Sequence, residues 1–288
     1  MDKSTIIGLT AGFGLIFLAI VTQGNFVAFV SVASLIIVLG GVICATIINH
    51  SIDDLVDTFK TVTTSLKETE KDPGDTIEMM VMFSRRARRN GLLVLDDDVM
   101  YVEDDYLRNG LELAIDGISE ENLVQILDDE IKGLERRQDL SIRVLESMSQ
   151  YSPAFGMIGT IIGLVMMLQN LTDPESLGVG LSIALITTFY GTMFANLIFA
   201  PLAGKMVKLA EQEMAEKEML RSGVISLANG ENPRIMEKKM LSFVTPEQRA
   251  DYIRINGERS YNQKQEDKLY NHWINQQKDK WESVLSNL

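Results

Sequence analysis

The chain has 288 residues, of which 46% are hydrophobic, and it carries a formal net charge of −13 and a single cysteine. One cysteine excludes a disulfide framework, and an acidic chain is poorly suited to bind the negatively charged backbone of nucleic acids. Long uncharged runs alternate with densely charged regions, so the composition has to be interpreted segment by segment.

Four uncharged apolar runs are each long enough to cross roughly 30 Å of hydrocarbon as a helix. A buried core helix can resemble one such run, but four runs in one chain favour a membrane protein. We interpret the first run as a retained span, because its n-region is only Met-Asp-Lys and no clear cleavage site follows it. The runs cover about residues 4–22, 26–48, 153–171 and 179–204.

The distribution of lysine and arginine predicts the topology. The connectors 23–25 and 172–178 contain neither residue, and basic residues near span ends favour the cytoplasmic side. We therefore expect a multi-pass protein with both termini and both charged regions in the cytoplasm. The basic residues closest to the span ends are Lys3, Arg143, Lys205 and Lys208.

The expected fold class is all-α: a polytopic membrane protein with four transmembrane helices and a mainly helical cytoplasmic domain. Strand signals are absent from the charged regions, where apolar residues follow helical spacing. The expected division is 1–49 for the first two spans, 50–150 for the cytoplasmic domain, 151–205 for the last two spans and 206–288 for a cytoplasmic helical tail.

Local signals place helix boundaries within the first charged region. The breaker "KDPGD" at 71–75 precedes a helix for which Asp75 is the expected N-cap and Asn90 the expected last residue, because glycine follows it. A second, long amphipathic helix is expected to begin after Ser119 and to continue into the third span.

Small and hydroxyl-bearing residues recur on one face of the third and fourth spans, at steps of four and three residues. Small residues allow helices to approach closely in lipid. A threonine hydroxyl either bonds to a carbonyl of its own helix or lines an ion path, and the sequence leaves both open. The residues are Gly156, Thr160 and Gly163 in the third span and Ala184, Thr188, Gly191 and Ala195 in the fourth.

The spans contain hydroxyl and amide groups but no carboxylate. Ionisable residues inside membranes usually mark the path of an ion. If this chain moves ions, we therefore expect a second chain to supply the acid. The sequence also contains no P-loop, metal-ligand spacing or nucleophile–base set, which argues against an enzyme.

Three motifs give the chain a family resemblance. "RARRNGLLVLD" at 86–96 is similar to the pattern Arg-x-x-Gly-Leu-Leu-x-Leu-Glu, and the other two are "SPAFGMIGTIIGL" at 152–164 and "ALITTFYGTMFANLIFAPLAGKM" at 184–206. With the four spans and the large domain after the second, they make the chain resemble the flagellar stator A subunits (MotA/PomA) of the MotA–TolQ–ExbB family.

The resemblance implies a torque-generating ion-channel subunit in the bacterial inner membrane that couples sodium or proton flow to rotor rotation. It implies a homopentamer around the transmembrane helices of two B subunits of the MotB/PomB type, which carry the essential aspartate. The other implied partners are the rotor protein FliG and membrane lipid. No cofactor is implied besides the transported Na⁺ or H⁺.

The resemblance also assigns a rotor-binding role. Arg88 and Asp96 match the charged pair that engages the rotor protein, with aspartate in place of the glutamate of the family. The neighbouring charges that share this role are Arg86, Arg89, Asp97 and Asp98.

Further roles are assigned within the spans. Pro153 and Pro201 match two prolines that couple ion passage to conformational change, and a proline loosens a helix locally. Thr160 and Thr188 match threonines typical of sodium-driven members, which favours sodium, and the expected ion pathway contains these two residues and Thr187. The residues expected to pack against the B helices are Gly156, Gly163, Ala184, Gly191 and Ala195.

Two alternatives remain open at this point. A TolQ/ExbB-like energiser would pass force to an envelope protein. Proteins of that type have three spans, whereas four are expected in this chain. A non-conducting membrane scaffold would bind a partner through its cytoplasmic helices, and it would tolerate alanine at Thr160 and Thr188.

Overall fold

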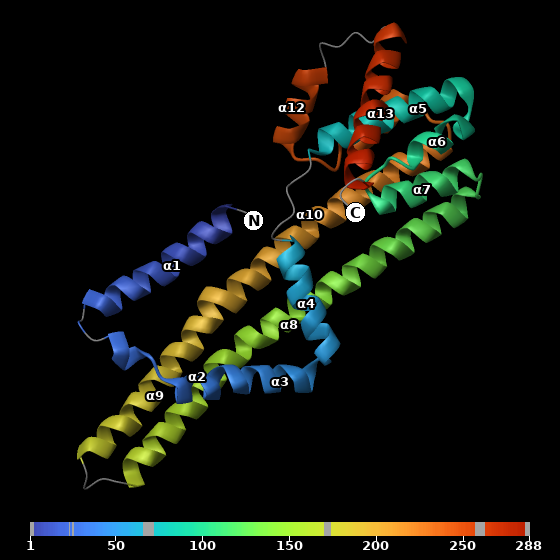
Figure 1. Ribbon diagram of the computed structural model, residues 1–288. Coiled ribbons are helices and arrows are strands. Elements are labelled where there is room, and N and C mark those ends of the chain that lie inside the picture. Colours follow the sequence, from blue (N-terminus) through green and yellow to red (C-terminus); the bar gives the residue numbers. More distant parts are fainter. Residues whose placement is uncertain are drawn as a thin grey trace. The chain divides into compact units, whose positions relative to one another are not determined.

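A computed structural model of the chain (Figure 1) describes residues 3–22, 24, 26–65, 72–169, 174–256 and 263–285. Every regular element in these residues is a helix, which confirms the predicted all-α fold. The chain forms two compact units: the first contains residues 1–69 and 136–210, and the second contains residues 70–135 and 211–288.

The first unit contains the N-terminal helices and the long hairpin of the third and fourth apolar runs. The N-terminal elements are α1 (Lys3–Thr22), η1 (Phe26–Phe29), α2 (Val32–Leu35), η2 (Ile36–Gly40), α3 (Gly41–Asn49) and α4 (Ile52–Ser65). The hairpin elements are α8 (Glu120–Gln169), α9 (Pro174–Phe194), η4 (Ala195–Phe199) and α10 (Ala200–Ala228), of which α8 begins and α10 ends in the second unit.

The second unit is built from shorter helices around the parts of α8 and α10 that belong to this unit. They are α5 (Pro73–Asn90), η3 (Leu92–Leu95), α6 (Asp96–Val99), α7 (Asp105–Ile115), α11 (Pro233–Met240), α12 (Pro246–Asn256) and α13 (Gln263–Leu285). Their shared core includes the fully buried side chains of Phe83, Leu111, Leu127, Leu220 and Met236.

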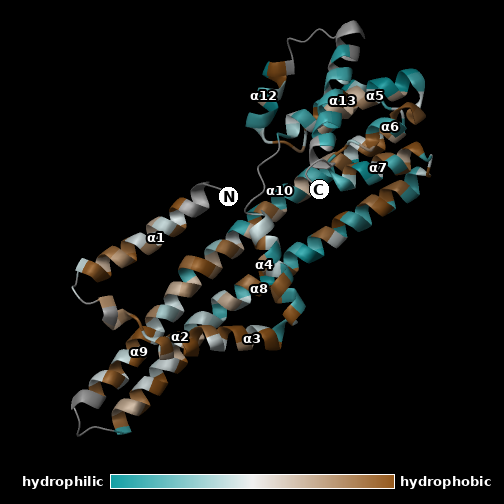
Figure 2. Cartoon of the chain, viewed as in Figure 1, coloured by the Kyte–Doolittle hydropathy of each residue, from teal (hydrophilic) through white to brown (hydrophobic). Residues whose placement is uncertain are grey.

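Three helical stretches among the described residues are long and apolar enough to cross a membrane. One is Val32–Asn49, and the other two lie within Glu120–Gln169 and Leu177–Ala228. In Figure 2, hydrophobic residues are brown, and they are frequent in the second half of α8 and in α9. The first apolar run forms α1, in which Ile7–Thr22 is a shorter apolar helix, so a fourth crossing stays a prediction.

The helix boundaries follow the local signals with one exception. Asp75 was expected to cap α5, but this prediction is wrong: the carboxylate of Asp72 accepts the hydrogen bond of the Gly74 N–H at 2.9 Å. Pro73 then occupies the first helical position, where its missing N–H costs nothing. The end at Asn90 is confirmed, because Gly91 adopts a φ of +87° that favours glycine.

The long helix expected after Ser119 is also confirmed. α8 runs without interruption from Glu120 to Gln169 and includes Pro153 in its interior. A proline inside a helix removes one backbone hydrogen bond. The helix therefore contains a locally weakened turn in its membrane-spanning half.

Glycines bring the backbones of α8 and α9 into direct contact. A Cβ atom at Gly163 would lie 2.5 Å from the Gly180 carbonyl oxygen, and one at Gly191 would lie 2.6 Å from the Ser152 carbonyl oxygen. Such close approach requires glycine, and it is typical of helix pairs in membranes. The small-residue stripes of the third and fourth spans thus first serve the packing of one span against the other.

The second span packs on the same hairpin. The ring of Phe155 on α8 lies directly against the backbone of Gly41 on α3. Near the other end of the span, the Tyr190 hydroxyl of α9 donates to the Phe29 carbonyl oxygen at 2.6 Å and accepts from the Ser31 N–H at 3.3 Å. These contacts fix the hairpin against the second span at two levels.

Replacing Gly163 with alanine is expected to lower the stability of the hairpin, because the new methyl group would collide with the backbone of α9. Overpacking of this kind costs about 1–3 kcal/mol. Gly178→Ala is the matched control, since nothing lies within 4 Å of its Cβ position; it should gain about 0.5–1 kcal/mol of helix propensity. Thermal unfolding in detergent measures both variants, and equal melting temperatures would contradict the packing described here.

Candidate functional site

Two threonine hydroxyls meet where α8 and α9 face each other. The Thr160 Oγ1 lies 3.0 Å from the Gly156 carbonyl oxygen of its own helix and 3.1 Å from the Ala184 carbonyl oxygen of α9. Thr160 also contacts the Thr188 hydroxyl, and Thr188 Oγ1 lies 3.1 Å from the same Ala184 oxygen. The threonine therefore bonds both to its own helix and across to the next span.

The hydroxyl pair has more contacts than protons. Each hydroxyl donates one hydrogen and offers two lone pairs, so Thr160 and Thr188 make at most two of their four contacts as donors at the same time. The hydrogens can exchange between acceptors without moving the helices. An oxygen lone pair can then turn towards a cation.

The third predicted pathway residue is placed differently. Thr187 is fully buried, and its hydroxyl bonds to the carbonyl oxygens of Ile183 and Ala184 on its own helix at 2.9 and 3.0 Å. A Cβ atom at Gly159 would lie 2.5 Å from the Thr187 side chain. Thr187 thus fills the α8–α9 contact, whereas Thr188 is exposed and Thr160 is half-buried.

The small residues predicted to face a B subunit lie at the contact between α8 and α9 of this chain. A Cβ atom at Gly156 would lie 3.0 Å from the Thr187 carbonyl oxygen, and Gly191 approaches Gly156 as closely. Packing of this face on a second polypeptide stays a prediction. The residues concerned, all buried, are Gly156, Gly163, Ala184, Gly191 and Ala195.

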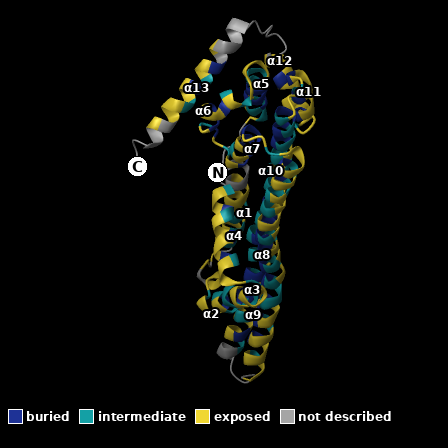
Figure 3. Ribbon diagram, turned by 90° about the vertical axis from the view of Figure 1, so that its right-hand side faces the viewer, coloured by how far each residue is buried: buried dark blue, intermediate teal, exposed yellow. Residues whose placement is uncertain are grey.

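The flank beside this stripe is apolar and exposed. Met157, Ile161 and Leu168 on α8 are 61%, 63% and 59% exposed, and α8 and α9 show exposed residues in yellow in Figure 3. Large apolar side chains in a membrane-spanning stretch face lipid or another helix. The hydroxyl pair therefore lies at the border between a glycine-packed contact and an apolar surface.

The two predicted hinge prolines both lie in helical backbone. Pro153 is inside α8, and Pro201 is the second residue of α10, directly after the π-helix η4. Because Pro201 cannot donate a backbone hydrogen bond, the preceding turn widens: the Ala200 N–H bonds to the Ala195 carbonyl oxygen, five residues earlier. Widened turns of this type often occur at functional sites.

The charged residues predicted to bind a rotor separate into two groups. Arg88, Arg89, Asp96 and Asp97 are exposed where α5 ends and α6 begins. By contrast, Arg86 lies 3.7 Å from the Asp98 carboxylate, which is only 12% exposed. Arg86 and Asp98 therefore act within the fold, whereas the other four side chains reach the surface.

The C-terminal helix α13 completes this internal cluster. The Tyr270 hydroxyl donates to the Asp98 carboxylate, and the Arg86 guanidinium lies over the Tyr270 ring at 4.1 Å. Burial, together with the bond to Asp98, raises the pKa of Tyr270, so that the hydroxyl keeps its proton. Trp273 packs against Phe83 with ring centroids 5.4 Å apart.

Sequence reasoning missed this cluster. Tyr270 and Asp98 are 172 residues apart, and neither belongs to a motif that predicts the other. The available signal is the aromatic content of the tail, because large aromatic side chains such as Trp273 usually pack against another element. α13 thus supports the segment that presents Arg88 and Asp96.

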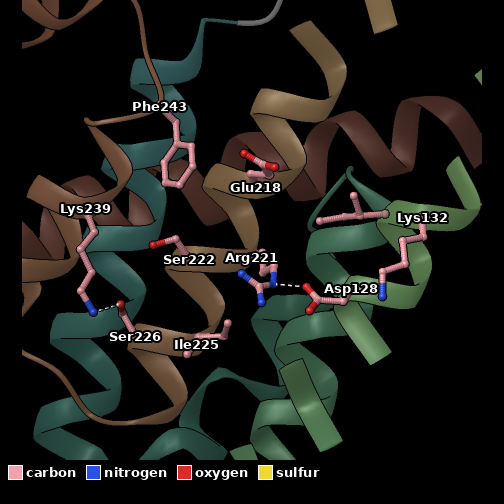
Figure 4. A pocket seen from close by; sticks show the side chains of 10 residues that line it. Asp128, Lys132, Glu218, Arg221, Ser222, Ile225, Ser226, Lys239 and Phe243 are labelled. Carbon is pink, nitrogen blue, oxygen red and sulfur yellow. Dashed lines mark hydrogen bonds and ion pairs between the residues drawn. The ribbon is translucent and has the colours of Figure 1, made fainter. Parts of the chain in front are cut away.

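An open groove of 530 Å³ lies in the second unit between α8, α10 and α11 (Figure 4). Its three basic side chains are already paired: Arg221 with Asp128, Lys132 with Asp129 at 3.5 Å, and Lys239 with Glu231 at 2.7 Å. A preformed ion pair offers little free charge to a ligand. We therefore assign the groove a structural role and locate the candidate site in the hairpin and the exposed charged segment.

The chain is similar to known proteins over most of its length. A family model described as "MotA/TolQ/ExbB proton channel family" matches residues 99–219. The protein named "Uncharacterized protein YtxD" of Bacillus subtilis is 36% identical over 250 residues, which cover 86% of this chain and 92% of that protein. Motility protein A of Treponema pallidum is 30% identical over 251 residues, which cover 87% and 97%.

A solved structure is also similar. The flagellar MotAB stator complex from Bacillus subtilis contains a chain that matches with a TM-score of 0.80 and 27% identity. The match covers 86% of this chain and 99% of that chain. The similarity therefore extends over almost the full length of the matched protein.

Replacing Tyr270 with phenylalanine should loosen α13, because the variant loses the hydroxyl that donates to Asp98. A hydrogen bond to a charged group contributes about 1.5–3 kcal/mol, so the amides of α13 should exchange with solvent markedly faster. Tyr101→Phe is the control, since it keeps the ring that lies 5.4 Å from the Lys278 ammonium. Equal exchange in the two variants would show that the Tyr270 hydroxyl does not hold α13.

Proposed function

We propose that this chain, which belongs to the MotA/TolQ/ExbB proton channel family, couples sodium flow to rotor rotation. It would do so as an ion-channel stator subunit of the flagellar motor. The observation that carries the proposal is the Thr160–Thr188 hydroxyl pair. It lies between two spans whose sequence contains no acidic side chain. The pair offers oxygen ligands, but it cannot carry the charge change that drives a cycle.

The missing acid is supplied by a second chain. The similar solved structure is a MotAB complex, and we propose that a B subunit with an intramembrane aspartate packs beside the exposed Thr188. A buried carboxylate that alternates between charged and neutral forms changes its attraction to the surrounding wall by several kcal/mol. This chain then forms the wall, five copies of which surround two B helices.

Hydroxyl and carbonyl oxygens favour sodium as the coupling ion. A dehydrated cation needs several oxygen ligands to replace its water shell, and Thr160, Thr188 and Ala184 provide three within one cluster. A proton would need only the titratable carboxylate of the B subunit and none of these oxygen ligands. We therefore propose Na⁺ as the transported ion and H⁺ as the alternative.

The rotor contact is proposed at the exposed charged segment. Arg88 and Asp96 lie at the end of α5 and the start of α6, where both signs of charge are exposed, and a rotor protein such as FliG would present the complementary pattern. Exposed charges steer association and set orientation more than they add affinity. The segment belongs to the charged part at 50–150, which we propose to be cytoplasmic, together with both termini, in the bacterial inner membrane.

Removal of sodium at a constant proton-motive force should stop rotation driven by this chain and its B subunit. Thr160→Ala should raise the sodium concentration needed for half-maximal speed about tenfold, which corresponds to roughly 1.4 kcal/mol of lost ligation, whereas Thr160→Ser should stay close to the parent. Thr192→Ala is the control, because that hydroxyl bonds only to carbonyls of its own helix. Undiminished rotation without sodium would remove the sodium assignment.

Charge reversal at the rotor segment should separate torque from ion flow. Arg88→Glu or Asp96→Lys should reduce rotation at least about tenfold, while ion flow through an unplugged complex remains near the parent level. Asp116→Lys reverses an exposed carboxylate elsewhere in the same unit and should have little effect. If ion flow stops together with rotation, these residues act on folding or on the channel, and the rotor assignment fails.

A further inference from the structure

The two prolines of the spans loosen turns that adjoin each other. Pro153 has no N–H to give to the Ser149 carbonyl, so one turn of α8, at residues 149–153, lacks a backbone hydrogen bond. Pro201 follows the widened turn η4, which begins at Ala195. Each helix therefore contains one weakened turn, and the position of each turn along its helix is fixed.

The antiparallel register brings these turns to the same level. Thr160 on α8 faces Ala184 on α9 at 3.1 Å. About three helical turns before Thr160, α8 reaches Ser149. About three turns after Ala184, the other helix reaches Ala195. The weakened turn of α8 thus starts at the level where the widened turn of the other helix starts.

The Ser149 side chain connects the two turns. The Ser149 hydroxyl, which is part-buried, donates to the Ala195 carbonyl oxygen at 3.4 Å. We propose that Ser149 is a positioning residue that makes the Pro153 and Pro201 turns bend together, so that a movement of one span is passed to the other. This inference rests on the proposed function, because it concerns how ion passage is converted into movement.

The neighbouring serine on α8 does not make such a connection. The Ser152 hydroxyl bonds to the Met148 carbonyl oxygen of its own helix at 2.7 Å. Ser149 is displaced from it by three residues and reaches the π-helical turn of the partner span. A hydroxyl on α8 is therefore not sufficient to connect the two turns; the serine must also lie at the level of Ala195, as Ser149 does.

The test compares Ser149→Ala, Ser149→Thr and Ser152→Ala in the complete complex with its B subunit. Ser149→Ala should leave ion flow through an unplugged complex within about twofold of the parent. The rotation rate under load should fall about two- to tenfold, the range expected from one lost hydrogen bond. Ser149→Thr keeps a hydroxyl and should restore rotation. Ser152→Ala should resemble the parent in both measurements.

Three results would overturn the inference. Rotation by Ser149→Ala at the parent rate removes the coupling role, and an equal loss in Ser152→Ala shows a general effect of serine in α8. A parallel loss of ion flow, or failure of the variant to assemble, assigns Ser149 to the channel or to folding. Failure of the proposed function is separate, because in that case the parent complex itself shows neither ion flow nor rotation.

Discussion

Glycine at positions 156, 163, 180 and 191 allows the backbones of α8 and α9 to touch, and this contact sets the register of the whole hairpin. In lipid there is no hydrophobic force between helices, so close packing and interhelical hydrogen bonds hold them together. The register decides which hydroxyl meets which carbonyl. Thr160 faces Ala184, and Ser149 faces Ala195, only because the glycines leave room for this approach.

The same contact explains how structural and functional roles are divided among similar residues. Thr187 and Thr188 are adjacent in the sequence, but a helix turns by about 100° per residue, so Thr187 enters the packed contact and Thr188 stays exposed. Arg86 and Arg88 differ in the same way on α5: one pairs with Asp98, and the other is exposed. Chemical type alone does not distinguish the members of either pair.

Much of this fold could be predicted from local sequence. Long uncharged runs and helical spacing predict α8 and α9, and a glycine after Asn90 predicts the end of α5, because these signals act over a few residues. The N-cap of α5 was missed because two aspartates flank Pro-Gly, and the structure uses Asp72. The bond from Tyr270 to Asp98 could not be predicted, since tertiary packing brings the two residues together.

The hydroxyl pair has a consequence for an idle complex. With no cation beside it, each hydrogen of Thr160 and Thr188 finds a carbonyl or the other hydroxyl, so the pair satisfies itself. An arriving cation finds only the lone pairs of two neutral hydroxyls, which do not offset the loss of its water shell unless a negative charge is close. In the complex that we propose, the resting wall therefore opposes ion leakage until a charged side chain of the B subunit makes entry favourable.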